Sequence, residues 1–153
     1  MKNFMCATLI ATMIISCSEN VETPLKSCTV KFDLESQQFP QTWKLVKMTG
    51  SMIDSERTGT DMDWQETLLL KQDGTFTKNR QQNNQLIEAS GIYSFALAGD
   101  SESIELSLTY TFESSIITSC YGLLFEKYIL ISNCKLIGTW SHCDGQGLEY
   151  VRQ

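Results

Sequence analysis

The feature of this sequence that most restricts its fold is a stretch, residues 103–112, in which apolar and polar side chains alternate. The alternate apolar positions are Ile104, Leu106, Leu108, Tyr110 and Phe112, with Glu, Ser and Thr between them. Successive side chains of a β-strand point to opposite faces of the sheet. An antiparallel sheet with one buried and one solvated face produces this pattern. The stretch therefore predicts an antiparallel strand with its apolar side toward a core.

The same reasoning predicts about eight strands in the chain from residue 39 onward. Asp73-Gly74 between apolar runs indicates a hairpin, and residues 98–102 form a polar turn that contains glycine. No segment repeats apolar residues at helical spacing for three turns, so the sequence predicts an all-β sandwich or barrel. The other strands are expected over residues 42–48, 66–70, 75–78, 91–97, 115–121, 126–132 and 148–152.

Two connections between these strands are long. Ser51 to Gln65 carries four acidic residues, and Lys135 to Gln146 carries Trp140 and His142. Long ordered loops in small domains are often functional. The alternative for the acidic connection is a solvated loop without a binding role.

Residues 1–16 have the composition of a secretory signal. Met1-Lys2-Asn3 is positively charged, Phe4 to Ile15 is uncharged and mostly apolar, and Ser16 is small. The apolar part has about twelve residues, whereas a membrane-spanning helix needs roughly twenty. We therefore expect an export signal that is removed.

The end of this signal, Ile14-Ile15-Ser16-Cys17, resembles the lipobox of bacterial lipoproteins. The resemblance implies that the thiol of Cys17 receives diacylglycerol, that the chain is cut before Cys17, and that the new amine is acylated, for example with palmitate. The alternative is an ordinary signal followed by a coincidental cysteine. In lipoproteins of double-membraned bacteria, aspartate after the lipidated cysteine commonly causes retention at the inner membrane. Ser18 stands there, so the resemblance implies the outer membrane of a Gram-negative bacterium.

The mature chain is acidic. Loss of Lys2 with the signal leaves 11 Lys and Arg against 18 Asp and Glu, a net charge of −7. This charge argues against a nucleic-acid partner, whose phosphates need a basic face. Residues 17–38 are polar and are expected to form the lipidated N-terminus and a tether that reaches roughly 25 Å. The domain is expected over residues 39–153.

Four cysteines remain after Cys6 is removed with the signal and Cys17 is lipidated: Cys28, Cys120, Cys134 and Cys143. An even number in an exported chain indicates two disulfides, with three pairings open. Their places along the chain favour Cys134 with Cys143, closing a hairpin, and Cys28 with Cys120. No pair of metal ligands has the spacing of a structural zinc site, so no metal is expected.

Several segments resemble, in order and spacing, the lipocalin-like domains of exported bacterial lipoproteins. They are Thr-Trp-Lys-Leu-Val at 42–46, Leu-Leu-Leu-Lys-Gln-Asp-Gly-Thr-Phe at 68–76, Ala-Ser-Gly-Ile-Tyr-Ser at 89–94 and Glu-Tyr-Val-Arg at 149–152. Gln41 stands where the lipocalin first strand usually has glycine, which leaves a related eight-stranded barrel as an alternative. The resemblance implies a closed, up-and-down, eight-stranded barrel. Such a barrel is either filled by its own side chains or holds one small ligand.

The sequence offers little for catalysis. His142 is the one histidine, and no Gly-x-Ser-x-Gly elbow supplies a serine for it. Asp61 and Asp63 could suggest the paired carboxylates of glycoside chemistry, but they match no calcium motif, and a solvated acidic loop is the favoured interpretation. We therefore expect no enzyme and no cofactor.

The aromatic residues on the expected strands are the candidate ligand-binding positions of the barrel interior, where they either pack as a core or line a pocket. Trp43 is expected to close one end. The first hypothesis is a membrane-anchored, non-catalytic binding domain for a small hydrophobic molecule. The second is a cell-envelope scaffold or protein-interaction module, including an enzyme inhibitor, with a filled barrel and partner-binding loops. A third, an enzyme using His142, predicts that His142→Ala abolishes an activity. The candidate interior residues are Tyr93, Phe95, Tyr110, Phe112, Tyr128 and Tyr150.

Overall fold

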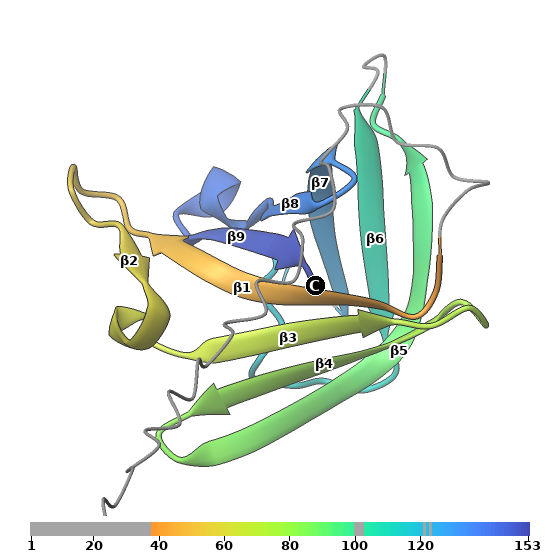
Figure 1. Cartoon of the computed structure of the whole chain (residues 1–153), viewed down its shortest axis with the longest axis horizontal. Coiled ribbons are helices and arrows are strands. Elements are labelled where there is room, and N and C mark those ends of the chain that lie inside the picture. The colour runs from red at the N-terminus through yellow and green to blue at the C-terminus, as the bar shows by residue number, and fades with distance from the viewer. Residues whose placement is uncertain (1–37, 100–102, 121, 123) are drawn as a thin grey trace, which may run out of the picture.

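The computed structural model describes residues 38–99, 103–120, 122 and 124–153, and these form a closed antiparallel β-barrel (Figure 1). Residues 1–37 lie outside the described part, and with them the expected signal, Cys17, Cys28 and most of the tether. The eight barrel strands are β1 (Gln41–Thr49), β3 (Gln65–Leu70), β4 (Thr75–Gln82), β5 (Gln85–Leu97), β6 (Ile104–Tyr110), β7 (Phe125–Ser132), β8 (Lys135–Gly138) and β9 (Gly147–Arg152).

The strand order makes this an up-and-down barrel of the lipocalin-like type. Each barrel strand pairs with the next one in sequence, and β1 closes the ring by pairing with β9. The two-residue strand β2 (Arg57–Thr58) extends the edge of β1 beyond β3. The expected fold class is thereby confirmed. Closure leaves no open sheet edge around the ring.

The expected strand over residues 115–121 is wrong, because its described part, residues 115–120, contains no strand. The eighth strand is instead β8, which lies inside the expected long loop Lys135–Gln146 together with the short 3-10 helix η2 (Trp140–Cys143). Only Leu136 and Gly138 of β8 are buried. Two inward positions are too few for alternation to reveal a strand.

The barrel interior is built by the inward sides of the strands, as alternation predicts. Leu106, Leu108 and Tyr110 of β6 are all buried. Phe112 is not, because β6 ends at Tyr110 and the chain bends at Thr111 and Phe112. The side chain of Phe112 is 78 % exposed, so its expected place in the interior is wrong.

Strand β5 pairs with β4 along its first part and with β6 along its second, and Gly91 lies where the two pairings overlap. Gly91 pairs with Phe76 on one side and with Tyr110 on the other. A Cβ atom at this position would lie 1.9 Å from the carbonyl oxygen of Thr109. The absence of a side chain therefore lets β6 approach β5 closely enough to pair.

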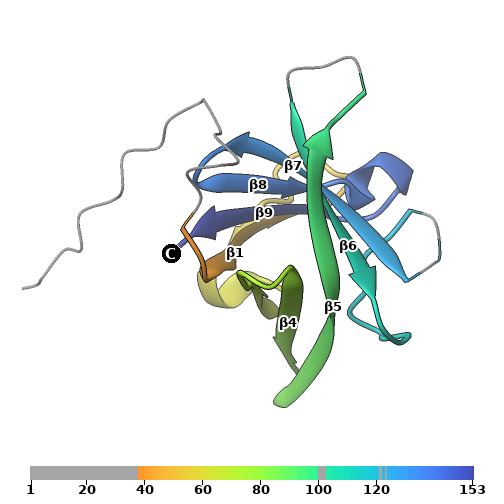
Figure 2. The same cartoon turned by 90° about the vertical axis from the view of Figure 1, so that its right-hand side faces the viewer.

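The connections fall at two ends of the barrel. The described N-terminus, the C-terminus and the β3–β4, β5–β6 and β7–β8 turns share one end, which we call the termini end. Figure 2 shows the starts of β1 and β8 and the end of β9 together on that side. The opposite end, the loop end, carries the β1–β3, β4–β5, β6–β7 and β8–β9 connections. The Asp73-Gly74 turn forms as expected, with Gly74 at φ 81°.

A disulfide joins two loops of the loop end, Cys120 to Cys143. Both expected pairings, Cys134 with Cys143 and Cys28 with Cys120, are therefore wrong. The expected hairpin between Cys134 and Cys143 contains β8, which puts these two cysteines at opposite ends of the barrel. Cys134 is disulfide-bonded as well.

Candidate functional site

Four charged side chains lie inside the barrel. Glu66 comes from β3, Lys78 and Arg80 from β4, and Glu126 from β7, and each is at most 5 % exposed. Charged residues are almost never buried unless they are paired. Two positive and two negative charges meet here, so the cluster is neutral overall.

Glu126 is the centre of this ion cluster. Lys78 Nζ donates to both of its carboxylate oxygens, at 2.9 and 3.0 Å. The hydroxyls of Tyr110 and Tyr128 donate to Oε2 at 2.7 and 2.6 Å. Thr118 donates its hydroxyl at 2.9 Å and its backbone N–H to Oε1. Five donor groups therefore compensate the charge of one buried carboxylate.

Glu66 holds the other half of the cluster. Lys78 Nζ lies 3.1 Å from Glu66 Oε1, and Arg80 Nε donates to Oε2 at 2.6 Å. The hydroxyl of Tyr150 also donates to Oε1, at 2.5 Å. The guanidinium of Arg80 stacks on the ring of Trp64, with its carbon 4.1 Å from the ring centre. Trp64 thereby covers the cluster toward the loop end.

The β6–β7 connection enters the barrel mouth and completes the cluster. Ile116 is fully buried, and its carbonyl oxygen accepts from Lys78 Nζ and from Arg80 NH2, both at 3.1 Å. Thr118 binds Glu126 from the same segment. We call residues 114–120 the plug. The disulfide at Cys120 fastens the plug to η2 on the outside.

The electrostatics of the cluster favour its charged form. Burial by itself would raise the pKa of Glu126, but the charge of Lys78 and the hydrogen bonds from Thr118, Tyr128 and Tyr110 outweigh it, so the pKa is lowered. Burial, together with the neighbouring carboxylates, raises the pKa of Tyr110, Tyr128 and Tyr150 well above that of free tyrosine. A general base works best with a pKa near the operating pH. A saturated carboxylate of lowered pKa is a structural anion and a poor base.

The predicted ligand-binding residues separate into three groups. Tyr110, Tyr128 and Tyr150 are buried and come together around the two carboxylates. Tyr93 and Phe95 are partly buried at the termini end and stack edge to face with ring centres 5.8 Å apart. Phe112 is outside. Trp43 is fully buried, as is Gln41, whose side-chain oxygen accepts from the indole N–H at 3.3 Å.

The four charged residues of the cluster were missed by sequence reasoning. The signal was present, because Lys78 and Arg80 follow Phe76 at spacing two and so share its inward face. A charge at an inward position is usually taken for the end of a strand. The partner of each charge lies on another strand, Glu66 at 14 residues from Arg80 and Glu126 at 48 residues from Lys78.

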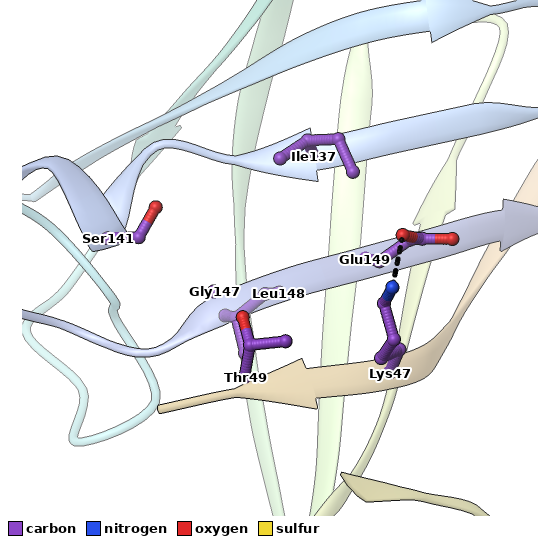
Figure 3. Close-up of a pocket in the computed structure, with 7 residues that line it drawn as sticks. All are labelled: Lys47, Thr49, Ile137, Ser141, Gly147, Leu148 and Glu149. Atoms are coloured by element: carbon purple, nitrogen blue, oxygen red, sulfur yellow. Dashed lines mark ion pairs between the residues drawn. The ribbon is translucent and has the colours of Figure 1, made fainter. Parts of the chain in front are cut away.

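Shallow depressions lie on the surface of the described residues around the filled interior. Figure 3 shows one on the outer face of β1, β8 and β9, where Lys47 and Glu149 form an ion pair at 3.4 Å. Its volume is about 200 Å³, below the roughly 300–1,000 Å³ of small-molecule pockets. Another, of about 520 Å³, opens to solvent over the outside of the plug and is lined by Glu113, Ser114, Ile117, Ser119, Gly122 and Leu124.

The remaining candidate residues lie on the surface of the loop end. His142 is exposed on η2. Asp63 pairs with Arg57 and accepts from the side chain of Gln146 at 2.8 Å, which ties the acidic connection to the β8–β9 loop. Within the described ranges, no group of three or more His, Cys, Asp or Glu side chains is arranged to hold a metal ion.

Fold and interior together define a closed lipocalin-like barrel filled by its own side chains. No protein-family model, no curated protein and no solved structure matches the chain. In the part of the chain that the structure describes, no helix is long and apolar enough to cross a membrane.

Proposed function

We propose that this chain is a lipid-anchored protein of the bacterial cell envelope whose filled barrel serves as a non-catalytic protein-interaction module. The observation that carries the proposal is the ion cluster, whose groups are directed at one another. Lys78 Nζ donates to Glu126, to Ile116 O and to the hydroxyl of Tyr128, and it forms an ion pair with Glu66. A polar ligand would have to break these contacts, and an apolar ligand would have to displace fully buried side chains.

The loop end offers the more suitable surface for recognition. Several of its large apolar side chains are exposed: Met52, Ile53, Leu86 and Phe112. The β6–β7 connection, which carries Phe112, is joined to η2 by the Cys120–Cys143 disulfide, and the β1–β3 connection, which carries Met52 and Ile53, is joined to the β8–β9 loop by the hydrogen bond between Asp63 and Gln146. Loops held in place lose less conformational entropy when a partner binds. This favours a protein partner over a ligand inside the barrel.

The anchoring part of the proposal rests on the sequence. The lipobox at Ile14 to Cys17 supports lipid attachment, and Ser18 supports the outer membrane. Disulfides belong to oxidising compartments such as the bacterial periplasm, so the bond between Cys120 and Cys143 supports export. The test is fractionation of the host cell. We expect the wild type in the membrane fraction and the Cys17→Ser variant outside it.

The interaction is tested by affinity capture from envelope extracts with matched surface variants. Ile53→Asp and Phe112→Asp place a charge on the loop end, whereas Ile92→Asp places one on the outer barrel wall, where Ile92 is also exposed. We expect the first two variants to lose partners that the wild type and Ile92→Asp retain. An unchanged partner set in all variants contradicts the proposal. So does a small molecule that stays bound to the purified protein in native mass spectrometry.

A further inference from the structure

We propose that residues 85–89, at the start of β5, form a docking edge for an extended, basic segment of a partner protein, which adds to the sheet as a further strand. β5 has 13 residues and β6 has 7, and the two strands pair from Gly91 to Leu97 of β5. Figure 2 shows the start of β5 reaching beyond the arrowhead of β6. Beyond the closed ring, residues 85–89 therefore pair with β4 alone among the described residues. This inference rests on the proposed function and specifies where on the loop end a partner binds.

Backbone hydrogen-bonding groups point outward along the docking edge. The carbonyl of Ser90 accepts from the N–H of Thr111, which follows β6, at 3.0 Å. Backbone groups of alternate residues in an antiparallel strand point to the same side. Leu86 and Glu88 therefore direct their N–H and C=O groups to the side opposite β4, where no other described residue pairs with them. A row of unpaired groups is a template for pairing with another chain.

The docking edge is extended before a partner arrives. Asn83 and Asn84 have φ angles of 50° and 60°, as a type I′ turn requires, and this two-residue turn places Gln85 opposite Gln82. β4 in turn pairs with β3 as far as Gln81. A strand that is already held on one side loses little conformational entropy when another strand adds to its free side. The geometry therefore suits recognition by strand addition.

The charge of Glu88 distinguishes between the possible occupants. Glu88 is exposed and takes part in no ion pair of the described residues. Two copies of this chain, paired antiparallel over the whole docking edge, would place their Glu88 carboxylates diagonally across from each other, about 7–8 Å apart. Both copies are also negatively charged overall. A second copy is thus repelled, whereas a lysine or arginine opposite Glu88 forms a favourable cross-strand pair.

The side chains of the docking edge set the pattern of the added segment. Leu86 is 68 % exposed and lies on the same outer face as Glu88. Ile87 pairs with the inward-facing Arg80 and is half-buried on the inner face. An added strand therefore presents a basic side chain on its outer face and an apolar one beside Ile87. The loop end carries further exposed carboxylates, which also favour a basic partner: Asp54, Asp61, Glu113 and Asp144.

Amide hydrogen exchange, followed by NMR on the full-length protein in detergent micelles, tests whether the docking edge is free. We expect the N–H groups of Leu86 and Glu88 to exchange at least about tenfold faster than those of Ile87 and Ala89, which point to β4. Equal protection of all four in a dilute sample shows that another part of the chain covers the edge. Protection of Leu86 and Glu88 that appears as the protein concentration rises shows that a second copy covers it. Either result overturns the proposal.

Strand addition is tested in the same sample with defined peptides. The probe is a short synthetic peptide in which lysine alternates with valine. One control has glutamate in place of lysine, and a second has the lysine sequence with its alternate backbone nitrogens methylated. We expect the probe to slow exchange at Leu86 and Glu88, the glutamate peptide to bind at least about fivefold more weakly, and the methylated peptide to protect neither amide. Equal binding of the probe and the methylated peptide, or binding of the probe without protection of these amides, contradicts strand addition.

A charge reversal on the docking edge tests the chemistry of the partner. Glu88→Lys should bind the glutamate peptide more tightly than the lysine peptide. Asp61→Lys is the matched control, because it makes the same change of charge at an exposed position of another loop on the same end. It should keep the preference of the wild type for lysine. If both variants change the preference equally, the attraction belongs to the whole loop end and the pairing opposite Glu88 is wrong.

A proline at position 86 separates this inference from the proposed function. Leu86→Pro removes an N–H that β4 does not use, and such edge positions tolerate proline, so the barrel should fold and the lysine peptide should no longer bind. If this variant does not fold, the methylated peptide still tests the same hydrogen bonds. If Leu86→Pro folds and keeps every captured protein that Ile53→Asp loses, the interaction module stands and strand addition is wrong. Loss of the same proteins from both variants supports strand addition when the peptides also bind as expected.

Discussion

Replacement of Glu126 by glutamine is the sharpest perturbation of the barrel interior. The amide has nearly the same shape, but it carries no charge, and its NH2 group cannot accept the hydrogen bonds that one carboxylate oxygen now receives. Removing one partner of a buried ion pair costs about 3–5 kcal/mol of folding free energy. Because Lys78 keeps Glu66 at 3.1 Å, we expect a loss of about 3 kcal/mol for Glu126→Gln.

Urea unfolding followed by tryptophan fluorescence measures this loss. The matched control is Glu88→Gln, since Glu88 is exposed on β5 and its replacement should change the stability by less than about 0.5 kcal/mol. If Glu126→Gln fails to fold, Tyr110→Phe removes a single 2.7 Å hydrogen bond to the same carboxylate and should cost about 1.5–3 kcal/mol. If Glu126→Gln is as stable as Glu88→Gln, the carboxylate of Glu126 does not hold the ion cluster together as the geometry indicates.

A double-mutant cycle isolates the ion pair itself. Lys78→Met combined with Glu126→Gln removes both charges, so the double variant should be more stable than the sum of the two single losses predicts, by up to about 3 kcal/mol. Strict additivity would contradict a direct interaction between the two side chains.

The ionised form of Glu126 stabilises the fold, so the free energy of unfolding should depend on pH. The pKa of Glu126 is lower in the folded protein than in the unfolded chain, so its contribution is fully present above the unfolded value of about 4.3 and is lost as the pH falls below it. Asp73 and Glu149 also have lowered pKa values and remain in the variant. We therefore expect Glu126→Gln to lose less stability than the wild type as the pH falls from about 4.3 to the pKa of Glu126 in the folded protein. If the stability of both proteins falls equally with pH in this range, Glu126 is not ionised in the folded barrel.

Three further perturbations test the surrounding structure. Tyr110, Tyr128 and Tyr150 should stay protonated above pH 10 until the barrel unfolds, because their raised pKa values favour the neutral hydroxyl. Absorbance at 295 nm measures tyrosine ionisation. Smooth titration of all five tyrosines of the chain in the folded state would contradict the expectation. Gly91→Ala should destabilise the folded barrel by about 3 kcal/mol, at the upper end of overpacking effects, because the new Cβ meets the backbone of Thr109. The control Ser90→Ala, on the exposed side of β5, should be nearly neutral in the same urea assay. Replacing both Cys120 and Cys143 by serine opens a loop with a sequence separation of 23, and the loop-entropy model predicts a loss of about 3 kcal/mol of folding free energy. An unchanged thermal midpoint would show that the ion cluster alone holds the plug.

Much of the fold follows from local sequence patterns. Alternation in residues 103–112 predicts β6, and Asp73-Gly74 predicts the turn between β3 and β4, because each depends on neighbours a few residues apart. The resemblance to lipocalin-like domains adds the closure of the barrel. Phe112 shows the limit of the pattern, since alternation does not reveal where a strand stops pairing.

The arrangement of charged side chains inside the barrel depends on the tertiary structure. The sequence by itself determined that apolar faces of about eight strands must be buried together, and it predicts an export signal. It did not determine that Lys78 and Arg80 point inward, because the free energy of burying a charge depends on partners that only the folded barrel supplies. Glu126 and Ile116 reach Lys78 from elements 48 and 38 residues away. The disulfide pairing has the same origin: Cys120 meets Cys143 because β8 turns the chain back to the loop end and leaves Cys134 with the termini.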